Sequence, residues 1–152
     1  MARITKISQK GLDLIKQFEG FSSKPYLCPA NVPTIGYGTT LYPIGSRVRM
    51  TDKPIDEYQA EIYLQDALET FESGVDSFTR DDITQHQFDA LVAFSYNLGL
   101  SALKGSTLLK KVNANPSDPT IKTEFMKWVN AGGKKLQGLV NRRNAEANLY
   151  FL

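Results

Sequence analysis

The stretch that decides the fold is residues 19–38, which have the sequence EGFSSKPYLCPANVPTIGYG. Its three prolines exclude a helix, because proline lacks the amide hydrogen that a helix interior requires. Pro25–Leu27 and Thr34–Tyr37 are predicted to form two short strands, separated by a turn at residues 28–31. The wider segment, about residues 21–50, is therefore expected to form a small antiparallel sheet.

A short helix is predicted immediately before this stretch, over residues 8–19, with Ser8 as its cap. Gly20 can end the helix by adopting a left-handed backbone conformation at little cost. The apolar residues that recur at helical spacing are Leu12, Ile15 and Phe18. Glu19 is then the last helical residue, at the point where the chain turns into the sheet.

The rest of the chain has helical patterns. Residues 56–80 predict one long helix with an apolar stripe, and Asp56 with Gln59 resembles a capping box. A second capping box at residues 84–87 begins the next helix. Shorter helices are predicted over 106–113, 119–130 and 139–150, with Gly132-Gly133 ending the middle one. The predicted class is α+β, in which a sheet lobe of about 21–50 is joined by the long helix to a mainly helical lobe of about 56–152 that includes the helix 8–19.

Composition excludes several classes of function. The formal net charge is only +2, which argues against nucleic-acid binding, and the densest basic cluster is expected to be a solvated helix face. Cys28 is the single cysteine, so no internal disulfide forms and no zinc spacing exists; neither a metal nor a cofactor is implied. No leader peptide and no membrane span are predicted, and the single free thiol fits a reducing compartment, so we expect the protein to fold in a cytosol. We also expect it to be a monomer. The densest basic cluster, which is expected to be a solvated helix face, consists of Lys134, Lys135, Arg142 and Arg143.

Glu19 is the first candidate for chemistry. Glycoside hydrolysis needs an acid that protonates the leaving oxygen, and a second group on the opposite face of the sugar ring. A glutamate at a helix end, facing a turn-rich sheet, fits the role of that acid if apolar neighbours raise its pKa. By residue type alone, a solvated glutamate at a helix end is the commoner case.

The motifs, taken together, resemble the phage-type lysozymes of glycoside hydrolase family 24. That family has Glu-Gly after the first helix, Asp or Cys nine positions later and Thr six further on, which correspond here to Glu19, Cys28 and Thr34. Thr34–Gly38 matches its Thr-Ile-Gly-Tyr-Gly motif. The resemblance runs in order from about residue 8 to 150, and its other motifs are at 87–94, 97–99, 105–108, 128–134, 138–140 and 142–146.

The resemblance implies a single lysozyme-like domain over 1–152 and an activity on bacterial peptidoglycan. Glu19 is expected to be the general acid, with a water held by Cys28 and Thr34, in an inverting cleavage between N-acetylmuramic acid and N-acetylglucosamine. One of two arginines is expected to pair with Glu19; which one is left open. The residues expected to bind substrate or support the site are Tyr26, Gly36, Tyr37, Gly38, Arg142 and Arg143.

The chain departs from the commoner family pattern at two positions: Cys28 where Asp is more usual, and Thr39 where His often follows. Two alternatives remain, a lytic transglycosylase that uses no water and a peptidoglycan-binding module that has lost catalysis. Related endolysins serve in phage lysis. We therefore expect a protein made in the host bacterial cytoplasm that reaches the cell wall after a separate protein permeabilises the membrane.

Overall fold

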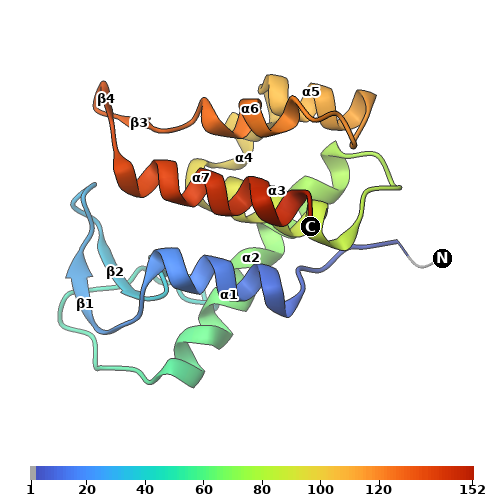
Figure 1. Cartoon of the computed structure of the whole chain (residues 1–152). Helices are drawn as coiled ribbons and strands as arrows, with labels where there is room; N and C mark the ends of the chain where they lie inside the picture. The colour runs from blue at the N-terminus through green and yellow to red at the C-terminus, as the bar shows by residue number, and fades with distance from the viewer. Residues whose placement is uncertain (1–2) are drawn as a thin grey trace. The chain divides into compact units, whose positions relative to one another are not determined.

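The computed structural model describes residues 3–152, so Met1 and Ala2 of the predicted leaderless N-terminus lie outside it. It has the predicted α+β composition (Figure 1). The elements are α1 (Gln9–Glu19), β1 (Ser22–Leu27), β2 (Pro33–Gly36), α2 (Glu57–Phe78), α3 (Gln85–Leu98), α4 (Leu100–Lys104), α5 (Thr107–Ala114), α6 (Ile121–Met126), β3 (Asn130–Ala131), β4 (Lys134–Lys135) and α7 (Gln137–Tyr150).

The chain divides into two compact units. One consists of Ile15–Thr70, and the other of Met1–Leu14 with Phe71–Leu152. Their boundaries fall within α1 and α2, so each of these helices contributes residues to both units. That residues 1–152 act as one domain stays a prediction.

The unit Ile15–Thr70 contains the predicted sheet. β1 pairs antiparallel with β2, with Tyr26 opposite Thr34 and Ser22 opposite Gly36, and the register shifts between these two pairs. The predicted turn connects the strands, and Asn31 donates its backbone N–H to the Cys28 carbonyl at 2.7 Å. The sheet that the prolines and glycines predicted is therefore confirmed.

The long helix α2 is also confirmed, over Glu57–Phe78. Its 22 residues span about 33 Å at 1.5 Å per residue. Asp56 caps its first turn, because Asp56 Oδ1 accepts the backbone N–H of Gln59 at 2.8 Å. Ala60 and Leu64 of the predicted apolar stripe are fully buried. Within residues 3–152, no helix has both the length and the apolar character that crossing a membrane requires.

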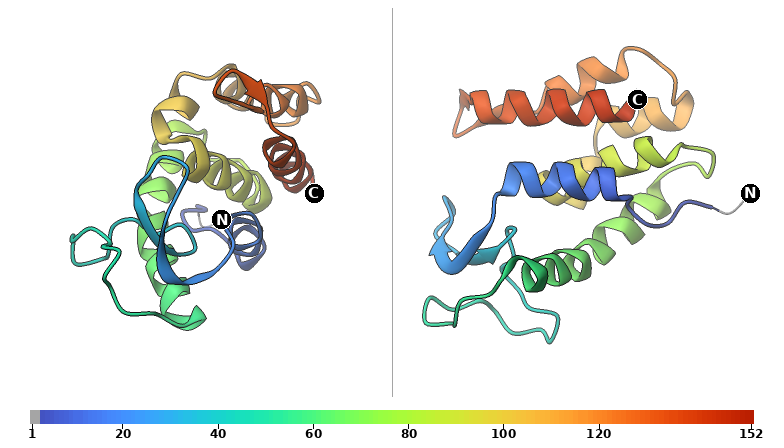
Figure 2. Two further views of the ribbon diagram at one scale, coloured as in Figure 1. Left: turned by 90° about the vertical axis from the view of Figure 1, so that its left-hand side faces the viewer. Right: turned by 60° about the horizontal axis from the view of Figure 1, so that its bottom comes forward.

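The second unit is built around α3. Thr84 and Gln87 form the predicted capping box at its start, and most of the helix is buried. α7 packs along α3, and α6 packs against α7 (Figures 1 and 2). The segment before α1 is held by acidic side chains of the same unit, because Glu72 accepts the backbone N–H of Ile7 and Asp89 accepts that of Ser8.

One prediction about this unit is wrong in detail, and one short helix is absent from the predictions. The helix predicted over 119–130 is only Ile121–Met126, and the chain then forms a hairpin from β3 and β4. Gly132 and Gly133 both have positive φ, 59° and 78°, which is the backbone that closes a two-residue hairpin rather than one that merely stops a helix. The short helix Leu100–Lys104 was not predicted either.

Candidate functional site

Glu19 is the last residue of α1, as predicted. Gly20 follows with φ of +71° and donates its backbone N–H to the Lys16 carbonyl at 2.9 Å, which closes the final turn of the helix. The Glu19 side chain is half-buried. Its carboxyl therefore belongs to a well-defined helix end, at a bend in the chain, and stays partly open to solvent.

Cys28 follows β1, at the start of the turn, and is partly exposed. Hydrogen bonds from the backbone of Val32 and then of Ala30, with one from the Thr34 hydroxyl, lower the pKa of the Cys28 thiol against the opposing effect of burial. These donors stabilise a negative charge on sulfur. The turn between the strands therefore favours the thiolate, which is the form that can accept a proton.

Thr34 is buried in β2, with only 3% of its surface exposed. Its hydroxyl donates to the Val32 carbonyl at 2.9 Å. A hydroxyl has one proton to donate, so Thr34 Oγ1 either keeps this bond or turns to donate to the Cys28 thiolate. While the bond to Val32 persists, the lone pairs of Thr34 Oγ1 can accept a hydrogen bond from a water or from the protonated thiol.

Tyr26 lies in β1, two residues before Cys28. Burial raises the pKa of the half-buried Tyr26, and the negative charges of Glu19 and Cys28 raise it further. Tyr26 is also the direct strand partner of Thr34. The strand pairing thus brings Tyr26 and Thr34 together next to Cys28, and that Glu19 belongs to the same site stays a prediction.

The glycines and tyrosine of residues 36–38 serve a tight turn. Gly36 and Gly38 have φ of +65° and +83°, and Ile35 and Thr39 exchange two backbone hydrogen bonds of 2.9 Å across them. A Cβ on Gly36 would lie 3.0 Å from the Cβ of Ala60, so the missing side chain lets α2 approach. Tyr37 is 7% exposed. These positions support the sheet, and their contact with a sugar stays a prediction.

Arg142 and Arg143 form a buried cluster with Glu146 on α7. Arg142 Nε donates to Glu146 Oε2 at 3.0 Å, and Arg143 Nε lies 2.9 Å from Glu146 Oε1 as an ion pair without hydrogen-bond alignment. Arg142 also donates to the Ala93 carbonyl and Arg143 to Asn97 Oδ1. The expectation that both arginines lie on a solvated face is wrong, because they are 4% and 0% exposed.

Burial has the largest effect on the pKa values of Glu146 and Arg143 in this cluster. Burial raises the pKa of Glu146, while the charges of Arg143 and Arg142 oppose that shift. Burial likewise lowers the pKa of Arg143, opposed by Glu146. Two guanidinium groups thus face one carboxyl group. The predicted pairing of an arginine with Glu19 would join residues of the two units and stays a prediction.

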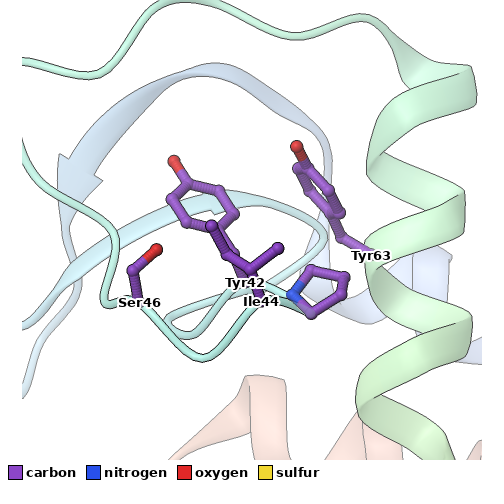
Figure 3. A pocket seen from close by; sticks show the side chains of 5 residues that line it. Tyr42, Ile44, Ser46 and Tyr63 are labelled. Carbon is purple, nitrogen blue, oxygen red and sulfur yellow. The ribbon is translucent and has the colours of Figure 1, made fainter.

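A separate pocket of about 290 Å³ lies in the unit Ile15–Thr70 (Figure 3). The Tyr42 and Tyr63 rings pack edge to face with centroids 5.2 Å apart, and the Tyr42 hydroxyl donates to Asp52 at 2.6 Å. The lining residues are Tyr42, Pro43, Ile44, Ser46 and Tyr63. None of the predicted site residues lines this pocket, so it is not where the candidate chemistry would occur.

Sequence reasoning missed three charged residues that organise the molecule. Glu146 lies four and three positions after the two arginines, and this ion-pair spacing on a helix could have indicated its role. Lys16 pairs with Glu61 across 45 positions of sequence, for which the sequence offers no signal. Within residues 3–152, no group of three or more His, Cys, Asp or Glu side chains is arranged to hold a metal ion.

Comparison with known sequences identifies relatives. Residues 16–146 match the family model described as phage lysozyme. The chain is 47% identical over 146 residues to an endolysin of Bacillus phage B103, covering 95% of this chain and 54% of that protein. It is 32% identical to the endolysin of Salmonella phage P22, covering 96% of this chain and 98% of that protein.

Solved structures agree. An endolysin of the Escherichia coli O157:H7 phage FAHEc1 superposes with a TM-score of 0.87 at 40% identity, covering 95% of this chain and 92% of that one. A variant of P22 lysozyme superposes with a TM-score of 0.86 at 30% identity, covering 98% and 100%. The small antiparallel sheet, the helical part and the long α2 are thus the phage lysozyme fold, as the motifs predicted.

The Bacillus phage relatives are longer than this chain. The chain spans about half their length, 54% for the B103 endolysin and 55% for that of phage PZA. The family model nevertheless covers most of the chain, and relatives more than 30% identical align over nearly all of it. The chain belongs to the phage lysozyme family.

Proposed function

We propose that this chain acts as an endolysin that hydrolyses the β-1,4 bond between N-acetylmuramic acid and N-acetylglucosamine in bacterial peptidoglycan. The observation that supports the proposal is that the strand pair of Tyr26 and Thr34 adjoins Cys28, and that the charges of Glu19 and Cys28 both raise the pKa of Tyr26. These residues lie within the segment that the phage lysozyme model matches. An acid, a potential base and a polar side chain for water are the parts that an inverting glycosidase needs.

Glu19 is the general acid in this proposal. Its carboxyl donates a proton to the glycosidic oxygen as the bond from that oxygen to the anomeric carbon breaks. Because the side chain is half-buried at a bend after α1, it can face a sugar chain without a rearrangement of the helix. Positive charge develops on the sugar ring, and the attacking water must stand on the opposite face.

Cys28 and Thr34 hold that water. The water attacks the anomeric carbon and passes one proton to the Cys28 thiolate, while Thr34 Oγ1 accepts its other O–H. The bond between Thr34 and the Val32 carbonyl leaves the oxygen of Thr34 oriented as an acceptor. At the end of the step Glu19 is a carboxylate and Cys28 a thiol, and exchange of one proton through solvent restores both.

The supporting residues divide into two groups. Tyr26 and Gly38 are partly exposed and are proposed to contact the substrate, whereas Gly36 and Tyr37 are buried and support the sheet. A supporting role of Arg142 or Arg143 toward Glu19 is proposed only from the resemblance to the phage lysozymes, since within α7 both arginines pair with Glu146.

The proposed partner is the cell wall of the host bacterium, approached as a monomer after synthesis in the cytoplasm. A separate protein that permeabilises the membrane would release the enzyme. No nucleic acid, metal or cofactor enters the proposed reaction.

Digestion of purified peptidoglycan, followed by mass spectrometry of the new glycan ends, tests the function. We expect reducing N-acetylmuramic acid ends. Anhydro ends would instead identify a lytic transglycosylase, in which Cys28 and Thr34 would have no water to hold. A chain that binds the wall and releases no ends would be a binding module without catalysis.

A further inference from the structure

The ring of Tyr37 contacts both sides of the chain around Glu19. The Nζ of Lys16, three residues before Glu19, lies 5.6 Å from the centre of the Tyr37 ring. The ring of Phe21, two residues after Glu19, lies 5.6 Å from the same ring, at an interplanar angle of 51°. Both distances are in the range of favourable cation–π and aromatic contacts. One side chain therefore touches the residues that precede and follow the proposed acid.

Lys16 has a second partner that holds it over the ring. Its ammonium group forms an ion pair and hydrogen bond with Glu61 of α2. The two side chains are 22% and 31% exposed, so solvent screens the pair only in part. Because the ammonium group is attracted by both the carboxylate and the ring, its position depends on α2 and on the sheet together.

Tyr37 is itself held firmly. It is 7% exposed, and it lies in the turn closed by the two backbone hydrogen bonds between Ile35 and Thr39. Gly36, immediately before it, packs against Ala60 of α2. The ring is thus held by the turn, whereas the end of α1 is a helix terminus at which the chain bends at Gly20.

We propose that Tyr37 is a positioning residue, which acts through Lys16 and Phe21 to fix the end of α1 and so the orientation of the Glu19 carboxyl. This inference rests on the proposed function, in which Glu19 is the acid. It assigns the tyrosine of the Thr-Ile-Gly-Tyr-Gly segment a role through its ring face rather than through a hydroxyl contact with sugar. Orientation matters because small displacements of a catalytic group lower the rate of the chemical step more than they weaken binding.

The test compares kcat and KM on soluble glycan strands prepared from peptidoglycan. Tyr37→Leu removes the ring, and we expect kcat to fall about tenfold while KM changes little, since orientation rather than affinity is lost. The conservative Tyr37→Phe keeps the ring face and should recover most of kcat. Lys16→Met should lower kcat in the same way, and Lys16→Arg should recover it, because a guanidinium group can contact both Glu61 and the ring.

Lys10→Met is the matched control, because Lys10 is an exposed lysine of the same helix. It should leave kcat unchanged. Thermal unfolding of every variant, with rates expressed per folded molecule, separates lost orientation from lost folding.

Two outcomes would overturn the inference. One is a Tyr37→Leu variant with the kcat of the unmodified chain. The other is a Tyr37→Phe variant with a raised KM, which would show that the hydroxyl contacts sugar. Glu19→Gln in the same assay separates this inference from the proposed function. If Glu19→Gln is active, Glu19 is not the acid and the proposed function is contradicted. If Glu19→Gln is inactive and Tyr37→Leu has an unchanged kcat, only the positioning role of Tyr37 is contradicted.

Discussion

Two regions of the chain, residues 19–38 and residues 130–150, each contain a hairpin next to a glutamate of a helix. The environments of the two carboxyl groups are opposite. Glu19 is half-buried, and the Cys28 thiol of the same region is partly exposed. Glu146 is 0% exposed and is surrounded by two guanidinium groups. A carboxyl that exchanges protons with a substrate must remain accessible, whereas a buried carboxylate with cationic partners contributes to structure. The comparison separates a candidate catalytic glutamate from a structural one in the same chain.

The two regions also differ in which groups stabilise the negative charge of Cys28 and of Glu146. The Cys28 thiol is stabilised as a thiolate by hydrogen bonds from the backbone of Val32 and Ala30, which are dipoles without net charge. Glu146 depends on the full charges of Arg142 and Arg143. Removing one partner should therefore affect the first region mainly in its chemistry and the second mainly in its stability.

Glu19→Gln should have the largest effect of the predicted changes. Glutamine keeps the size and hydrogen bonding of the side chain but has no acidic proton, and general acid catalysis contributes about 10²–10⁴ in rate. We expect lysis of cell walls to fall by at least that factor, measured as loss of turbidity of a wall suspension, with an unchanged melting temperature. Glu69→Gln, at an exposed position of α2, is the control. A Glu19→Gln variant that lyses walls at the original rate would exclude Glu19 as the acid.

Glu146→Ala should instead unfold the protein more easily. It leaves two guanidinium groups in a buried site without their carboxylate, and breaking a buried ion pair in this way costs about 3–5 kcal/mol. We expect a loss of that order in the free energy of unfolding, measured by urea titration, whereas Glu69→Ala should change it little. A loss as small as that of the control would mean that the cluster contributes nothing to stability and that the contrast between the two glutamates is false.

Much of this contrast could be predicted from the sequence, and part of it could not. The spacing of a recognised motif predicts Glu19, Cys28 and Thr34 as site residues, and this stays a prediction, whereas the sheet predicted from its prolines and glycines is confirmed; both signals are local. The burial of Arg142 and Arg143 was missed, because charged residues are mostly exposed and only tertiary packing against α3 reverses that expectation. The pairing of Lys16 with Glu61 depends on the end of α1 and the start of α2 coming together, which no local pattern encodes.

The hairpin before α7 shows a different reason for failure. Gly132-Gly133 indicates a chain reversal in either interpretation, as a helix stop or as a two-residue turn. The strands that flank it are only two residues each, too short for an alternating pattern to appear. Local pattern therefore located the break correctly and assigned the wrong structure to its surroundings.

Cys28 tests whether the first region works through its thiolate. Because the pKa of Cys28 lies below its ordinary value, the thiolate forms at lower pH than in a free cysteine, and activity should rise with pH as the thiol loses its proton. Cys28→Asp should remain active and lose that rise, since a carboxylate with a reference pKa of about 3.9 is already ionised. Cys28→Ala and Cys28→Ser should lower the rate about tenfold to a hundredfold, because neither supplies a base at neutral pH.

The measurement for Cys28 is the rate of wall lysis as a function of pH, for the original chain and the three variants. Alkylation of the thiol, which is the only one in the sequence, provides a second test and should inhibit. An alkylated protein with full activity would remove Cys28 from the mechanism and leave Glu19 and Thr34 to account for it.

The smallest predicted effect concerns one glycine from each region. Gly36 and Gly132 have nearly equal positive φ, 65° and 59°, so alanine at either position costs about 1–2 kcal/mol in backbone strain. Their surroundings differ, because a Cβ on Gly36 would lie 3.0 Å from that of Ala60, whereas a Cβ on Gly132 would meet nothing within 4 Å. Gly36→Ala should therefore lower the free energy of unfolding by about 1 kcal/mol more than Gly132→Ala, since the crowded contact adds the cost of overpacking. Urea titrations of the two variants measure this difference. Equal losses in the free energy of unfolding would show that α2 moves far enough to accommodate the added methyl group. Gly36 would then be required only for its backbone conformation, and the close approach of α2 to the sheet would not depend on the absence of a side chain.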